Sequence, residues 1–199
     1  MTYETLEYAI ELVKKLEYKH VLEFGVYKGI TIKIIRERLS DNFDVYGFDT
    51  FTGLPEDWID PLGDVAGGVC KKGFFSTDGI IPDVNGIKFY KGLFKDTLQE
   101  YVKVAKPIAL IHMDCDLYSS AKDVLYNLND YIMKGTIISF DEWFYSSSGK
   151  YYGDHEQRAF YEWLEEFDRD FESIELPVDY KRMEIPHGLV ERKIVKIIK

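Results

Sequence analysis

Apolar segments of strand length alternate with amphipathic helical segments along the chain, and this alternation constrains the fold more than any other feature. The segments with strand character are residues 20–25, 44–50, 87–92, 108–116 and 135–143. The segments with apolar residues at helical spacing are 4–17, 30–40, 94–104, 119–132 and 154–168. Strands that alternate with helices are typical of an open, doubly wound, mostly parallel α/β sheet. We therefore expect that fold class.

The remaining parts of the chain fit one domain. Two extended segments, residues 171–178 and 189–198, end the chain and predict a terminal pair of strands. Residues 51–86 are rich in Gly and Pro and show little periodicity beyond one short helix. Irregular segments of this length in a compact domain are usually functional or disordered. No repeat or linker divides the chain, so we expect a single domain over residues 1–199.

Charge and cysteine content narrow the class of partner. The chain holds 25 Lys and Arg against 35 Asp and Glu, a formal net charge of −10, so it lacks the basic surface that nucleic acids or anionic membranes attract. No apolar run approaches the roughly 20 residues of a membrane helix. Cys70 and Cys115 are spaced neither as a metal pair nor as a disulfide framework, and no signal peptide is evident. We expect a soluble, cytoplasmic protein with a small-molecule partner; its aromatic surface and terminal strands are compatible with a homodimer.

Residues able to do chemistry gather where the predicted strands end. Ligands of open α/β sheets bind beyond the carboxyl ends of the strands. The residues at such ends are Gly25, Asp49, Gly92, Asp114 with Asp116, and Asp141 with Glu142. This common location predicts a ligand site at one edge of the sheet.

The loop after the first predicted strand, "EFGVYKG", favours a bound ligand. Gly25 and Gly29 permit a tight turn and a close backbone approach, although both could be simple turn glycines. The loop is not GxGxxG, and it lacks the lysine and hydroxyl of a phosphate-binding loop. Asp49 ends the second strand twenty-odd residues later, where an acid can accept hydrogen bonds from ribose hydroxyls.

The segment "IHMDCDLYSS" carries the strongest chemical signal. In a continuous strand, His112, Asp114 and Asp116 would point the same way, and two neighbouring aspartates repel each other unless a cation or a proton intervenes. A hard ion such as Mg²⁺ or Ca²⁺ prefers carboxylate oxygens, and Asp141 with Glu142 could supply further ligands from the next strand. We interpret the four acids as a metal site.

Simpler interpretations of this segment stand beside the metal site. The two aspartates could instead cap the following helix, although Ser119 or Ser120 is the better expected cap. His112 lies inside the strand, so we expect a buried core histidine.

A second set of candidates follows the last predicted parallel strand. These aromatic residues could line a substrate pocket or pack over the sheet edge, and for each one singly we expect packing. They are Trp143, Phe144, Tyr145, Tyr151 and Tyr152. His155 is either a surface helix residue or a base that leans over the pocket.

Several motifs together resemble a known family. "EFGVYKG", "GFDTFTGLP", "KGLFKDTL", "IHMDCDLYSSAKDVL" and "GTIISFDEW" occur in order over roughly residues 20–145. They resemble class I S-adenosylmethionine-dependent methyltransferases, and within these the macrocin O-methyltransferase group with its relatives in aminocoumarin biosynthesis. The resemblance implies a Rossmann-like sheet with a reversed, antiparallel C-terminal strand and bound S-adenosylmethionine.

The resemblance also implies roles for particular residues. Glu23, Gly25 and Gly29 would lie against the amino-acid portion of the cofactor, Asp49 would hold the ribose, and Phe51, Gly92 and Leu93 would flank the adenine. Asp114, Asp141 and Glu142 would bind Mg²⁺, with Asp116 as general base. The family often has an aspartate where this chain has Glu142. Its antibiotic-tailoring members also carry a longer N-terminal region, in place of which residues 55–86 could cover the site.

The function that follows is methyl transfer to a hydroxyl of a small molecule by in-line displacement. An alcohol is a poor nucleophile at neutral pH, so a metal that lowers its pKa and a carboxylate that takes its proton supply what the reaction lacks. A sugar, a glycosylated natural product or a catechol-like compound would be a suitable acceptor. Two alternatives remain open: a metal-dependent glycosyltransferase with an Asp-x-Asp site, and a non-catalytic cofactor-binding module.

Overall fold

The computed structural model describes residues 3–59, 64–147, 150–151, 155–176, 183–185 and 188–199. Its strands are β1 (His20–Phe24), β2 (Asp44–Asp49), β3 (Ile87–Lys91), β4 (Ile108–Met113), β5 (Ile137–Ser147), β6 (Lys150–Tyr151), β7 (Phe171–Ile174), β8 (Met183–Ile185) and β9 (Gly188–Ile197). Its α-helices are α1 (Glu4–Val13), α2 (Ile30–Arg38), α3 (Phe94–Tyr101), α4 (Tyr118–Leu128) and α5 (His155–Glu166). Two short 3-10 turns, η1 (Ala66–Gly68) and η2 (Asn129–Tyr131), complete the described elements.

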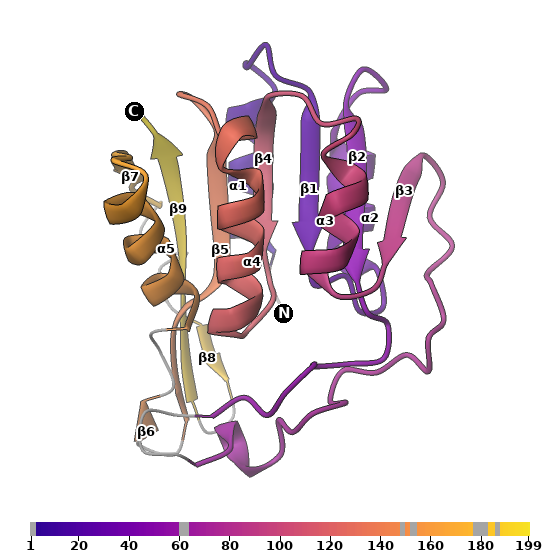
Figure 1. Ribbon diagram of the computed structural model, residues 1–199, viewed down its shortest axis with the longest axis vertical. Coiled ribbons are helices and arrows are strands. Elements are labelled where there is room, and N and C mark those ends of the chain that lie inside the picture. The colour runs from indigo at the N-terminus through magenta and orange to yellow at the C-terminus, as the bar shows by residue number, and fades with distance from the viewer. Residues whose placement is uncertain (1–2, 60–63, 148–149, 152–154, 177–182, 186–187) are drawn as a thin grey trace.

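The strands form one mixed sheet in the order β3-β2-β1-β4-β5-β9-β7 (Figure 1). The neighbours from β3 to β5 are parallel, whereas β9 runs antiparallel to both β5 and β7. The predicted fold class, a doubly wound and mostly parallel sheet with a reversed C-terminal strand, is confirmed. The added pairs of β6 with β5 and β8 with β9 were not expected.

Helices cover both faces of the sheet. Helices α3, α4 and α5 lie on one face, and α1 and α2 lie on the other (Figure 1). In β1, Leu22 and Phe24 pack toward the first layer and Val21 toward the second, so this strand is buried on both faces. No helix among the described residues is both long and apolar enough to cross a bilayer.

The start of α4 corrects the expected serine cap. The helix begins at Tyr118, and Ser119 and Ser120 lie in its first turn, with no side-chain cap from its N-cap residue. Instead, the Tyr118 N–H donates to Nδ1 of His155, at 3.1 Å. A side chain from α5 therefore satisfies an N–H group that the sequence assigned to a local cap.

The end of β4 also differs from expectation. The strand stops at Met113, so the expected strand over residues 108–116 is too long, and alternation along a strand does not place the two aspartates. The Asp114 N–H donates to the Phe24 carbonyl at 2.9 Å, and Asp116 has a positive φ of 63°. The chain therefore turns sharply at the carboxyl end of the sheet, and this turn carries the acids.

Residues 51–59 and 64–86 form a packed loop. Its described helical content is η1, in agreement with the expected single short helix. Leu54, Trp58, Ala66 and Cys70 form a small apolar cluster with Leu117, the residue before α4. This cluster fastens the loop beside the turn that carries the acids.

Gly25 brings the ends of β1 and β4 into contact. It has a φ of 92°, and a Cβ atom at this position would lie 1.6 Å from the Asp114 carbonyl oxygen. The Gly25 N–H also donates to the Phe48 carbonyl, at 3.0 Å. A side chain here would have to separate the two strand ends, so glycine is required by space as well as by backbone conformation.

We expect Gly25→Ala to lower the free energy of unfolding by about 3 kcal/mol or more, because backbone clash adds to the strain of a positive φ. Urea unfolding followed by circular dichroism measures this. Gly68→Ala is the matched control, since Gly68 has a φ of 75° but nothing within 4 Å of its would-be Cβ. The control should lose only about 1 kcal/mol. Equal losses in the two variants would contradict the proposed close contact.

Candidate active site

A cavity of about 390 Å³ opens beyond the carboxyl ends of the parallel strands. Its volume lies within the range of small-molecule sites. The predicted site residues that line it are Gly25, Asp49, Asp114, Asp116, Asp141 and Glu142. The glycine loop and the acids, which lie far apart in the sequence, thus share one cavity.

The other predicted cofactor residues lie outside the cavity lining. They are Glu23, Gly29, Phe51, Gly92 and Leu93. Gly29 is the N-cap of α2, Leu93 is the N-cap of α3, and Phe51 is fully buried. Their roles toward a cofactor stay predictions.

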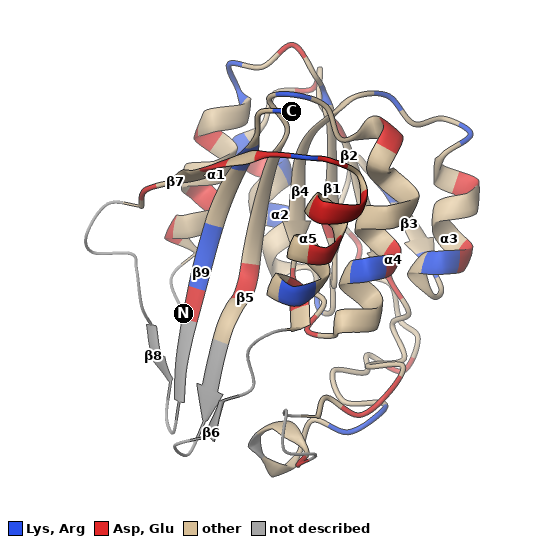
Figure 2. Ribbon diagram, turned by 60° about the vertical axis from the view of Figure 1, so that its left-hand side comes forward, with Lys and Arg blue, Asp and Glu red and all other residues tan. Residues whose placement is uncertain are grey.

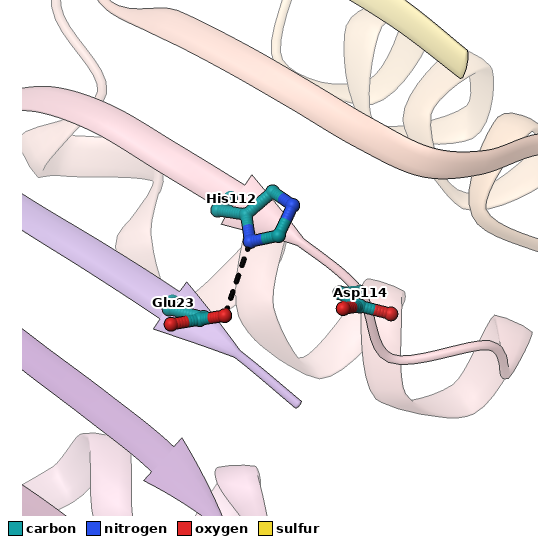
Figure 3. Close-up of side chains that lie close together, drawn as sticks. All are labelled: Glu23, His112 and Asp114. Atoms are coloured by element: carbon teal, nitrogen blue, oxygen red, sulfur yellow. Dashed lines mark hydrogen bonds and ion pairs between the residues drawn. The ribbon is translucent and has the colours of Figure 1, made fainter. Parts of the chain in front are cut away.

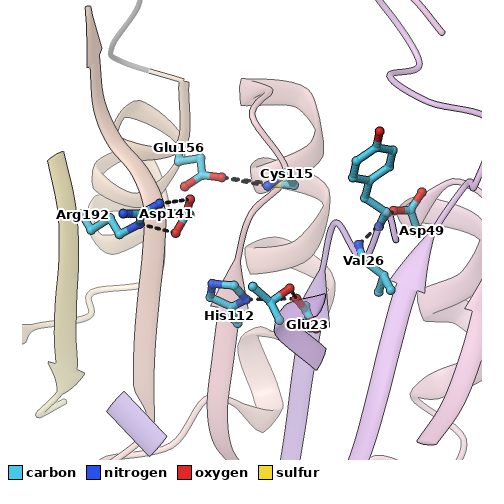
Figure 4. A network of polar contacts seen from close by, with 10 residues as sticks. Glu23, Val26, Asp49, His112, Cys115, Asp141, Glu156 and Arg192 are labelled. Carbon is cyan, nitrogen blue, oxygen red and sulfur yellow. Dashed lines mark hydrogen bonds and ion pairs between the residues drawn. The ribbon is translucent and has the colours of Figure 1, made fainter. Parts of the chain in front are cut away.

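Asp49 joins two loops at the cavity. Its Oδ2 accepts hydrogen bonds from the N–H groups of Val26, at 2.8 Å, and Tyr27, at 2.7 Å (Figure 4). Its Oδ1 accepts a third from the Phe51 N–H, at 2.6 Å. A carboxylate has about four acceptor positions, so three bonds leave about one for a ligand hydroxyl.

Glu23 and His112 form a buried pair on neighbouring strands. Oε1 of Glu23 lies 3.3 Å from Nδ1 of His112 and also accepts a hydrogen bond from the Thr31 hydroxyl (Figure 3). The prediction of a buried core histidine is confirmed, since His112 is 1 % exposed. Burial raises the pKa of Glu23, and the hydrogen bond from His112 partly offsets this increase. One ligand atom from each of this pair and Asp114 lies within 4.8 Å of the others.

Asp114, Asp141 and Glu142 form the acid cluster of the cavity. One carboxylate oxygen of each lies within 4.8 Å of the others, so the structure brings together the acids that the sequence predicted as metal ligands. Burial and the neighbouring charge of Asp141 raise the pKa of Asp114 and of Glu142 well above the ordinary values. Like charges held together out of water therefore favour either protons or a cation.

Asp116 lies beside this cluster. It is 8 % exposed, and burial, with the charges of Asp141 and Asp49, raises its pKa to about 7. A carboxyl with a pKa near neutrality is suited to take a proton in general base catalysis.

Arg192 pairs with Asp141, and the sequence did not reveal it. Nε donates to Oδ1, and an Nη2–H donates to Oδ2 at 2.9 Å, forming a two-bond fork (Figure 4). Although burial alone would raise the pKa of Asp141, the hydrogen bonds and charge of Arg192 hold it below its ordinary value. The acidic band of β5 lies beside the basic band of β9 (Figure 2). Only the pairing register of these strands identifies the partner.

Glu156 is a second residue that sequence reasoning missed. It is fully buried on α5, and its Oε1 accepts a hydrogen bond from the Cys115 N–H at 3.0 Å (Figure 4). It therefore supports the turn between Asp114 and Asp116. Its spacing from Ala159 and Phe160 places it on the buried face of the helix, a signal that was available in the sequence.

His155 does not line the cavity. Its Nδ1 accepts the Tyr118 N–H, so Nε2 carries the proton and faces the Ile59 carbonyl at 2.9 Å. Both ring nitrogens thus take part in contacts that hold the packed loop and α4, and the geometry favours Asp116 over His155 as base.

The predicted aromatic wall is partly described. Trp143 is buried, and its ring packs against Phe140 and Phe160, at 5.0 and 5.8 Å between centroids, which confirms the packing interpretation for this residue. Phe144 is half-buried. Tyr152 and the side chains of Tyr145 and Tyr151 lie outside the described residues.

Comparison with protein families gives a match to the macrocin-O-methyltransferase (TylF) model over residues 74–163. The predicted family resemblance is confirmed. The match includes α3, β4, α4 and the acidic turn between β4 and α4. The enzyme class predicted for the chain, an O-methyltransferase, is the class that this family model describes. No curated protein matches the sequence.

Solved structures of methyltransferases share the fold. CalS11, a calicheamicin methyltransferase, has a TM-score of 0.66 and 22% identity, covering 94% of this chain and 77% of that one. The O-methyltransferase NovP has a TM-score of 0.61 and 20% identity, covering 98% and 80%. An O-methyltransferase from Bacillus cereus in complex with SAH has a TM-score of 0.60 and 14% identity, covering 100% and 82%. At these identities the likeness establishes the fold.

Glu156 predicts a pH dependence of stability for the metal-free protein. Burial raises its pKa to about 8, above roughly 4.3 in an unfolded chain, so the folded state binds the extra proton. The stability this group contributes is present at low pH and lost as pH rises toward 8. Relative to Glu156→Gln, which cannot titrate, the wild type should lose up to about 1.4 kcal/mol per pH unit between pH 5 and 7.

Urea unfolding in the presence of a chelator at several pH values measures this difference. Glu165→Gln removes an exposed carboxylate from the same helix and should leave the pH profile unchanged. Parallel profiles for wild type and Glu156→Gln would show that Glu156 titrates normally.

Proposed function

We propose that this protein is an S-adenosylmethionine-dependent O-methyltransferase that transfers a methyl group to a hydroxyl of a small molecule, with assistance from Mg²⁺. The observation that carries the proposal is the shared cavity: the glycine loop with Asp49 forms one part of its lining, and the acid cluster with Asp116 forms another. Methyl transfer needs a donor and an activated acceptor side by side, and this cavity offers a place for each.

The lining fits a nucleoside cofactor. Gly25 contributes main chain to the cavity lining, and Asp49, fixed by three N–H groups, keeps about one acceptor position for a ribose hydroxyl. Bound S-adenosylmethionine would supply a methyl group activated by its sulfonium. Among the structural neighbours, TomG from Streptomyces achromogenes was solved with SAM and the Bacillus cereus enzyme with SAH, which supports this cofactor.

The acid cluster fits a hard divalent ion. Its donors are carboxylate oxygens, and Oε2 of Glu142 is buried without a hydrogen-bond partner among the described residues. Asp114, Asp141 and Glu142 would hold Mg²⁺, which would act as a Lewis acid that lowers the pKa of the acceptor hydroxyl. The orphaned oxygen of Glu142 supports this assignment, because a buried carboxylate oxygen without a partner is costly.

Asp116 would take the proton of the acceptor hydroxyl onto a carboxylate oxygen. Its pKa of about 7 suits proton uptake near neutral pH, and the positive φ of 63° is a conformation that aspartate tolerates better than most residues. The bond between Glu156 and the Cys115 N–H fixes the turn and so holds the Asp116 carboxylate at the cavity.

The lining of the same cavity supports a class of acceptor. Leu54, Pro55 and Phe75 of the packed loop contribute an apolar wall, and the acids lie in the same cavity. A vicinal diol on a sugar or a catechol offers two oxygens to a divalent ion and an apolar face to this wall. CalS11 is described as a TDP-rhamnose 3'-O-methyltransferase, which favours a sugar acceptor. On this proposal the packed loop covers the acceptor.

Calorimetric titration of metal-stripped protein with S-adenosylhomocysteine, with and without Mg²⁺, tests the cofactor. We expect binding in both conditions, because the glycine loop and Asp49 do not depend on the metal. Protection of the protein against heat by UDP-sugars with Mn²⁺, together with no response to S-adenosylhomocysteine, would favour a glycosyltransferase instead.

Asp114→Asn tests the division of the cavity into two functional parts. We expect loss of metal-dependent methyl transfer, at least about a hundredfold, with S-adenosylhomocysteine affinity within about threefold of wild type. Transfer of label from S-adenosylmethionine to a panel of sugars and catechols measures the activity. Asp41→Asn, at an exposed loop position, is the matched control. Undiminished transfer by Asp114→Asn would remove this residue from the mechanism.

A further inference from the structure

Arg192 occupies an unusual position for a cation, since it lies in the cavity lining against a residue that the proposed function assigns to Mg²⁺. The side chains of Arg192 and Asp141 are 12 % and 19 % exposed, so their ion pair is shielded from most of the solvent. A guanidinium held there is a permanent positive charge within the acid cluster, because arginine does not lose its proton in proteins.

The register between β5 and β9 is irregular opposite Arg192. Phe140 pairs with Lys193 and Phe144 pairs with Glu191, so three residues of β5 lie opposite Arg192 alone. Such a bulge re-aims side chains at the edge of a site. Here it lets the successive residues Asp141 and Glu142 both line the cavity with Arg192, whereas an unbroken register would place successive side chains on alternating faces.

The fork leaves Asp141 only partly available to another cation. Nε of Arg192 donates to one carboxylate oxygen and Nη2 donates to the other, so neither oxygen is free of the guanidinium. A divalent ion at the cluster would share Asp141 with this group and lie close to its charge. In a partly buried site, two positive charges at a separation of several Å repel each other by an amount that matters to binding.

We infer that Arg192 is a resident counter-cation of the acid cluster, which shares Asp141 with the divalent ion and thereby weakens metal binding. The inference rests on the proposed function, because it takes the acid cluster as the Mg²⁺ site. A weakly held ion is retained best when the acceptor adds its own oxygens, so Arg192 would couple metal occupancy to the arrival of a chelating acceptor such as a vicinal diol.

Calorimetric titration of metal-free protein with MgCl₂ alone tests the inference without any acceptor. Arg192→Gln removes the charge and keeps one polar N–H donor toward Asp141, and we expect it to bind Mg²⁺ at least about tenfold more tightly than wild type. Lys193→Met is the matched control. It removes one positive charge at the next residue, whose Nζ lies 4.5 Å from the ring centre of Trp143, and we expect its affinity to stay within about twofold of wild type.

The outcomes separate this inference from the proposed function. Tighter Mg²⁺ binding by Arg192→Gln than by wild type supports the inference, and so does Mg²⁺ binding by Arg192→Gln when the wild type shows none. Equal or weaker binding by Arg192→Gln overturns it and leaves the Mg²⁺ site standing when the wild type binds. Absence of binding in both proteins overturns the Mg²⁺ site and the inference together, whereas the titration with S-adenosylhomocysteine tests the cofactor separately.

A second variant keeps the test informative if Arg192→Gln does not fold. Arg192→Lys retains the charge but cannot form the two-bond fork, so we expect an affinity between those of wild type and a variant without the charge. An affinity equal to or below that of wild type would contradict the sharing of Asp141.

Discussion

The placement of several carboxylates in one cavity is the constraint around which the site is organised. Asp114, Asp116, Asp141 and Glu142 line the same space, and burial together with their mutual repulsion disfavours ionisation of most of them. Two effects reduce the repulsion between these carboxylates: Arg192 supplies a positive charge beside Asp141, and the raised pKa values of the other acids favour their neutral, protonated forms. A sheet that gathers acids in this way is stable only when protons or cations accompany the carboxylates.

The turn between β4 and α4 carries Asp114 and Asp116, and contacts from other parts of the fold hold its backbone in place. Its backbone is held by the Phe24 carbonyl at one residue and by the Glu156 carboxyl at the next. The first N–H of α4 is held by His155, which also contacts the packed loop at Ile59. Two elements distant in sequence, β1 and α5, thus fix a few residues, which is typical of preorganised sites.

The fold was predictable from sequence because strands buried on both faces are mainly apolar, and β4 shows that pattern with His112 as its one polar residue. The positions of Gly25, Asp49 and the acids followed from the rule that sites form at strand ends. The end of β4 was predicted wrongly, because the turn at Asp114 depends on contacts with β1 and α5 rather than on local propensity. Arg192 was beyond sequence reasoning for a similar reason: its partner is set by the register between β5 and β9, which depends on contacts distant in sequence.

The contact between Gly25 and the Asp114 carbonyl has a thermodynamic consequence. The glycine loop and the acidic turn touch through main-chain atoms, and the Asp114 N–H is bonded to the residue before Gly25. A ligand that shifts one of these segments must therefore shift the other, and any coupling free energy between the two halves acts equally in both directions. The affinity of each of two ligands in this cavity thus depends, through a single pair of strand ends, on whether the other is bound.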